Sequence, residues 1–89
     1  MLPFEDREFP EYTVRIFREW CKEEDLQWHW DEEDRWISLL GQSDWKFQFD
    51  NHLPFYLKQG EPLFIPKGVF HRIIKGTGSF VITIRKSSK

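Results

Sequence analysis

The sequence predicts a single small all-β domain, and three features support this prediction. Short segments of alternating or wholly apolar residues recur along the chain from residue 25 onward. Gly, Asn and Asp residues that favour turns separate these segments, which is typical of a β-barrel or sandwich. Aromatic residues make up 18% of the 89 residues, and such large rings can fill a thin core between short strands.

We expect strands at several places, each ended by a turn or a proline. The clearest is 45–49, Trp-Lys-Phe-Gln-Phe, which alternates apolar and polar residues and is followed by Asp50-Asn51. The segment 12–25 is ambiguous, because its apolar residues from Ile16 to Cys21 would also share one face of a helix. We favour a strand over 12–18 and an acidic loop over 22–25. The other expected strands are 35–40, 55–57, 63–65, 69–74 and 79–85.

The first eleven residues differ in character from the rest of the chain. Pro3 and Pro10 indicate an extended arm over 1–11, before a barrel that spans 12–86 of the single domain 1–89. Phe4 and Phe9 give this arm apolar side chains that can pack over the barrel or onto a neighbouring subunit. We expect a homodimer.

Charge and composition argue against several classes of partner. The formal net charge is −2, with both signs interspersed, whereas binding to nucleic acid phosphates favours a concentrated basic surface. Cys21 is the single cysteine, so an intrachain disulfide is excluded. The first residues lack the pattern of a secretory signal, and no apolar run approaches the ~20 residues that span a bilayer. We therefore expect a cytoplasmic protein without nucleic acid or membrane partners.

The most informative segment runs from Gly60 to His71. Gly60 closes a turn, five residues follow, Pro66-Lys67-Gly68 forms a second tight turn, and His71 begins the next strand. This arrangement directs the imidazole of His71 back into the mouth of the barrel.

This segment resembles the second motif of the cupin superfamily, which is Gly, five to seven residues, Pro-x-Gly, two residues and His. The family usually places Asn four residues after that His, where Lys75 stands here. The first cupin motif is His-x-His, three or four residues, Glu, six residues and Gly. Counted back from Gly41, Asp34 takes the Glu position, His29 the second His and Gln27 the first. The resemblance covers about 27–84 and implies a small jelly-roll barrel, a double-stranded β-helix.

In cupins these motif positions bind a divalent transition metal. The resemblance therefore implies that His29, Asp34 and His71, with Gln27 as a fourth ligand, hold Fe, Mn, Ni, Zn or Cu, which suits imidazole and carboxylate donors. Asp31 is the alternative carboxylate, because His29-x-Asp31 followed by His71 resembles the ligand order of iron oxygenases with this fold. The spacing to Gly41 favours Asp34 over Asp31.

The two histidines allow two interpretations of function. In the first, the protein is an enzyme that catalyses metal-dependent oxygenation or isomerisation of a small organic molecule. In the second, the barrel has no metal and is a non-catalytic module that binds a small ligand such as a sugar or an acid. Strand parity predicts that Trp28 and Trp30 point away from the pocket, into a core or onto a dimer surface. The residues expected to line the pocket are Trp36, Ser38, Leu40, Phe47 and Phe49.

Overall fold

The computed structural model describes residues 2–86, and these residues form eight β-strands and one short 3-10 helix. The all-β fold predicted from the sequence is therefore confirmed. Among the described residues, no helix has the length and apolar character that a membrane crossing requires. The strands are β1 (Glu5–Glu8), β2 (Thr13–Phe17), β3 (Arg35–Leu39), β4 (Lys46–Phe49), β5 (Phe55–Tyr56), β6 (Leu63–Ile65), β7 (His71–Ile74) and β8 (Phe80–Lys86), and the 3-10 helix is Glu23–Asp25.

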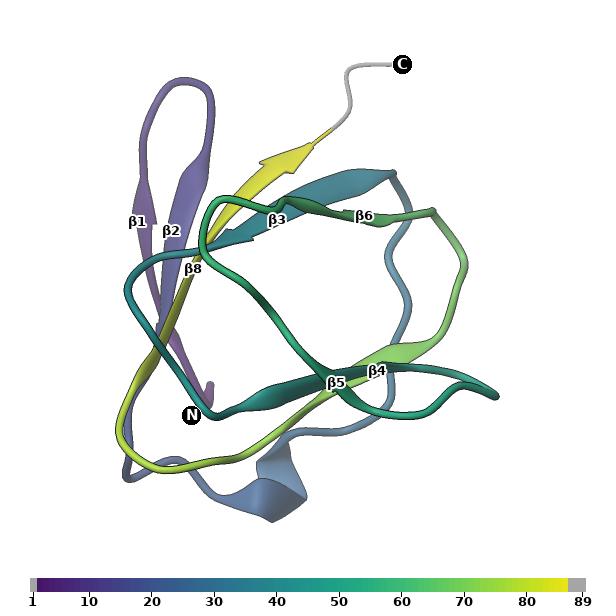
Figure 1. Ribbon diagram of the computed structural model, residues 1–89. Helices are drawn as coiled ribbons and strands as arrows, with labels where there is room; N and C mark the ends of the chain where they lie inside the picture. Colours follow the sequence, from purple (N-terminus) through teal and green to yellow (C-terminus); the bar gives the residue numbers. More distant parts are fainter. Residues whose placement is uncertain (1, 87–89) are drawn as a thin grey trace.

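The strands form two antiparallel sheets that face each other (Figure 1). The larger sheet has the order β1-β2-β8-β3-β6, and the smaller sheet has the order β5-β4-β7. In Figure 1, β3 and β6 form the upper layer, and β4 and β5 form the lower layer. The chain passes from one sheet to the other repeatedly after β3, so residues far apart in the sequence meet between the layers.

Aromatic rings fill the space between the two sheets. The ring of Trp45 stacks on that of Phe80 with a centroid distance of 5.3 Å and an interplanar angle of 5°. Its indole Nε1 donates to the carbonyl oxygens of Thr77 and Gly78, each at 3.2 Å, so this buried polar group is satisfied. The other buried core side chains are Phe17, Cys21, Ile37, Leu39, Phe47, Leu57, Ile65, Ile82 and Ile84.

The N-terminal arm packs over the barrel and contains a strand of its own. The residues of β1 pair antiparallel with β2, with Asp6 opposite Arg15, and Phe4 contacts Phe17 at a centroid distance of 5.4 Å. The sequence does not predict this strand, because four consecutive charged residues show no apolar alternation. Charged side chains suit an edge strand, since they discourage pairing with a further chain.

The ambiguous segment near residue 16 is a strand, as we expected, and the acidic loop after it contains the 3-10 helix.

Trp28 and Trp30, which follow this loop, are 39% and 50% exposed, so neither belongs to the core between the sheets. The guanidinium carbon of Arg72 lies 4.7 Å from the centroid of the Trp28 ring. The expected homodimer stays a prediction.

Candidate metal centre

The site begins with a backbone pairing between two distant segments. His29 and His71 form an isolated antiparallel bridge, in which His29 N donates to His71 O at 3.0 Å and His71 N donates to His29 O at 2.9 Å. Residues that exchange both hydrogen bonds lie directly opposite each other, so their side chains project from the same face. The pairing continues where Gly68 N donates to the carbonyl oxygen of Asp31 at 2.9 Å. The loop before β3 is thereby held against β7.

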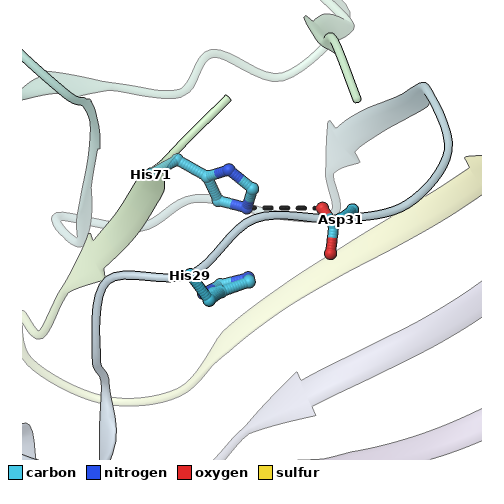
Figure 2. A group of neighbouring side chains, drawn as sticks. All are labelled: His29, Asp31 and His71. Atoms are coloured by element: carbon cyan, nitrogen blue, oxygen red, sulfur yellow. Dashed lines mark ion pairs between the residues drawn. The ribbon is translucent and has the colours of Figure 1, made fainter. Parts of the chain in front are cut away.

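Three side chains converge at this bridge (Figure 2). The rings of His29 and His71 have a centroid distance of 4.3 Å, and one carboxylate oxygen of Asp31 lies 3.5 Å from His71 Nε2. One ligand atom from each of the three residues lies within 4.8 Å of the others. Figure 2 shows the Asp31 carboxylate beside the His71 ring, with His29 on the same loop as Asp31 and His71 on the neighbouring strand β7.

Both imidazoles keep one ring nitrogen available. His71 Nδ1 lies 2.9 Å from the carbonyl oxygen of Val69, and His29 Nδ1 lies 3.2 Å from that of Gln27. A carbonyl oxygen only accepts, so Nδ1 carries the hydrogen in each ring and Nε2 keeps its lone pair. Metal-binding histidines are oriented in this way. His52 makes the same contact on the surface, so the feature is meaningful only because the two rings converge.

Burial lowers the pKa of His71 below its ordinary value of 6.5, and the nearby His29 ring lowers it further. The Val69 carbonyl and the Asp31 carboxylate oppose this change without cancelling it. The imidazole is therefore neutral at pH 7, and the contact between His71 and Asp31 is not an ion pair in that state.

The carboxylate of Asp31 provides the test of whether a metal fits. Its Oδ1 lies 3.3 Å from Arg35 Nη1, whereas its Oδ2 is buried and has no hydrogen-bond partner among the described residues. An unsatisfied buried carboxylate oxygen costs roughly 1–3 kcal/mol or more. This oxygen faces the lone pair of His71 Nε2, so two acceptors point at each other. A cation between them satisfies both atoms, and the donor set therefore fits a divalent metal.

Two residues of the predicted ligand set have other partners. Asp34, which the motif spacing favours, accepts a hydrogen bond at Oδ1 from the backbone nitrogen of Lys67 at 2.8 Å. Its carboxylate thus holds the turn before His71, and the carboxylate beside the imidazoles belongs to Asp31. Gln27 lines the cavity at the site, but its amide nitrogen donates to the carbonyl oxygen of Glu24. The side-chain oxygen of Gln27 is therefore the atom that remains available to coordinate a metal.

A cavity of about 390 Å³ adjoins the three side chains. This volume is near the lower end of the range of about 300–1,000 Å³ for small-molecule pockets. Its polar residues other than the three above are Arg15, Asp25, Gln27 and Arg35. Its apolar wall consists of Pro3, Phe4, Phe17, Leu26, Ile37, Phe47, Ile65, Ile73, Ile82 and Ile84.

The structure corrects part of the predicted pocket wall. Phe47 lines the cavity as expected, and Phe49 packs against Phe47 at a centroid distance of 5.1 Å without reaching the cavity. Trp36 and Ser38 lie on the opposite face of β3, whose inward residues are Ile37 and Leu39 with Arg35, and Leu40 follows the end of the strand and is 45% exposed. Residues i and i+2 of a strand share a face, and Asp34 lies before β3, so a residue at this position does not fix which face of the strand lines the cavity. Trp36 is 45% exposed and contacts Phe64 instead.

Comparisons with known proteins identify the fold. No protein-family model and no curated protein matches the sequence. Among solved structures, a cupin-2 domain containing protein from Shewanella frigidimarina matches with a TM-score of 0.65 and 21% identity, over 93% of this chain and 80% of that one. A cupin domain from Bordetella pertussis matches with a TM-score of 0.61 and 16% identity, over 96% and 94% of the two chains.

A third match is FeII HppE, with a TM-score of 0.63 and 15% identity; it covers 94% of this chain, and the chain spans 48% of HppE. At these identities the likeness establishes the fold alone. The protein therefore has the cupin fold, a jelly-roll barrel, as the resemblance of the sequence motifs implied.

Proposed function

We propose that the protein is a metal-dependent cupin that binds a divalent transition metal through His29, Asp31 and His71. The observation that carries this proposal is the pair of acceptors, Asp31 Oδ2 and His71 Nε2, which face each other at 3.5 Å in a buried position. Two imidazoles and one carboxylate are the ligand set of the 2-His-1-carboxylate centres that hold Fe(II). The presence of FeII HppE among proteins of the same fold supports this choice of metal.

We further propose that the cavity admits a small organic molecule, which undergoes metal-dependent oxygenation or isomerisation. A metal held by three protein atoms keeps open coordination positions, and when bound it supplies a Lewis acid or a redox centre. The chain's own contribution is to orient the ligand atoms and to provide an apolar wall beside them. Val69 and Gln27 fix the two rings, Arg35 holds one oxygen of Asp31, and the apolar wall gives the reacting molecule a surface to pack against.

Titration calorimetry with Fe(II) under anaerobic conditions, and with Mn(II), Ni(II), Cu(II) and Zn(II), tests the proposal. We expect one ion per chain for the unmodified protein and a large loss of affinity in His29→Ala and Asp31→Asn. His29 is exposed, so we expect its replacement to leave the fold intact, and the loss can then be attributed to the missing ligand.

His52→Ala is the matched control, because His52 is exposed and has the same Nδ1 contact to a carbonyl oxygen without lying at the site. We expect its metal binding to be unchanged. Failure of all five metals to bind the unmodified protein contradicts the proposal and leaves a non-catalytic binding module. Retained binding in Asp31→Asn shows that the carboxylate ligand is wrongly assigned.

A further inference from the structure

Two arginines line the cavity, and they differ in how many of their donors are already used. Arg35 bonds to Glu33 Oε2 through Nε and Nη2, each at 2.8 Å, and its Nη1 lies 3.3 Å from Asp31 Oδ1. All three of its nitrogens therefore have protein partners. We interpret Arg35 as a residue that positions the carboxylate of Asp31.

Arg15 reaches the cavity because of its place in the larger sheet. Its position on β2 is opposite Ile82 on β8, and both residues project from the face that lines the cavity, as does the buried Phe17 two residues later. Asp6 on β1 is opposite Arg15 on the other side and shares this face. A charged side chain is thus held at 21% exposure in a mainly apolar wall.

Only one edge of the Arg15 guanidinium is occupied. Its Nε and Nη2 donate to the two carboxylate oxygens of Asp6 at 2.8 and 2.9 Å, and its carbon lies 3.8 Å from the centroid of the Phe4 ring. No residue within 2–86 accepts a hydrogen bond from Nη1. The edge formed by Nη1 and the second hydrogen of Nη2 offers two parallel donors, which is the geometry that binds a carboxylate bidentately.

We propose that the cavity binds a small organic acid whose carboxylate pairs with the unoccupied edge of Arg15. The short apolar body of the acid then lies along Ile37, Ile73 and Ile82, which belong to the same cavity wall. This inference rests on the proposed function in one respect, since the metal bound by His29, Asp31 and His71 is the reacting centre for that acid. Asp6 and Phe4 fix the guanidinium plane in advance, so little side-chain freedom is lost when the acid binds.

Titration of butanoate and hexanoate, with butanamide and hexanamide as neutral matches, tests the inference on Zn(II)-loaded and on metal-free protein. We expect each acid to bind about tenfold or more tightly than its amide, because hydrogen bonds to charged groups contribute that much. The metal-free titration shows whether Arg15 alone provides this preference, and we expect the preference to persist there. The preference is therefore measurable even if no metal binds.

Arg15→Met keeps the apolar stem and should reduce acid binding to the level of the amide without changing metal affinity. Arg15→Lys keeps the positive charge but lacks the two parallel donors of the guanidinium, so the preference for acid over amide should fall by an intermediate amount. This variant provides a second readout if the methionine variant does not fold. Arg85→Met is the matched control, since Arg85 is 60% exposed and lies outside the cavity. Equal binding of acids and amides, absence of binding by either acid, or an unchanged preference in both Arg15 variants overturns the inference.

Discussion

Asp34 Oδ1 accepts a hydrogen bond from the backbone nitrogen of Lys67, a residue 33 positions later in the chain. This bond ties the loop before β3 to the Pro66-Lys67-Gly68 turn, and His71 lies just beyond that turn. Gly68 adopts a φ of +78°, a value that favours glycine. Asp34 thus stabilises the segment that presents His71.

Asp34→Ala should lower the free energy of unfolding by about 1–2 kcal/mol, because it removes a charge-assisted bond to a backbone donor. Metal affinity should fall much less than in Asp31→Asn, since Asp34 lies outside the proposed ligand set and bonds to Lys67 instead. Urea denaturation and metal titration of both variants measure the two effects. A greater loss of metal affinity in Asp34→Ala than in Asp31→Asn would restore the assignment that the motif spacing favours.

Asp31→Asn should behave differently in the metal-free protein. We expect its free energy of unfolding to stay equal or to rise by up to about 1 kcal/mol, because an amide replaces the unpaired buried oxygen and can donate to His71 Nε2. Arg35 keeps Glu33 as its partner. The stabilisation that added metal gives to the unmodified protein should disappear. A loss of more than about 2 kcal/mol without metal would show that this carboxylate mainly stabilises the fold.

The metal-free protein should lose stability in mild acid through His71. Burial lowers the pKa of this imidazole in the folded chain, whereas in the unfolded chain it titrates near 6.5. Below pH 6.5 the unfolded chain therefore binds a proton that the folded chain does not, so stability falls as the pH decreases toward the folded pKa. The slope from this residue is at most about 1.4 kcal/mol per pH unit. Above pH 7 the residue contributes no pH dependence.

Urea denaturation of EDTA-treated protein between about pH 5 and 7.5 measures this dependence. His71→Gln removes the group and should show a shallower fall than the unmodified protein, whereas His52→Gln should not change the slope. Equal slopes in the unmodified protein and in His71→Gln would contradict the account of His71 as a buried neutral imidazole.

The sequence predicts the fold and both histidines for a clear physical reason. Gly60 and Gly68 adopt positive φ values, which favour glycine at these turns. The spacing from Gly60 through Gly68 to His71 can therefore be recognised in the sequence. The convergence of His29 with His71 depends on a backbone pairing between segments far apart in the chain. Their resemblance to cupin motifs predicted it, whereas strand periodicity alone contains no such information.

Other features escape prediction because strand facing depends on tertiary register. In β2, the apolar residues Val14 and Ile16 alternate with Arg15, and such a pattern usually directs the apolar side chains inward. The structure reverses this, since Arg15 faces the cavity and pairs with Asp6. Asp6 belongs to the charged strand β1, and the sequence of this strand has no apolar alternation from which a strand could be predicted. Only the contacts in the structure show which carboxylate lies beside the imidazoles: Asp31 lies 3.5 Å from His71, whereas Asp34 bonds to Lys67.

A crystal structure of the protein soaked with Zn(II) shows which carboxylate binds the ion. We expect one ion at about 2.0–2.2 Å from Nε2 of His29, Nε2 of His71 and Oδ2 of Asp31, with the hydrogen bond between Asp34 and Lys67 unchanged. An ion bound by Asp34, or a fully soaked crystal in which no ion lies between Asp31 and His71, would contradict this expectation.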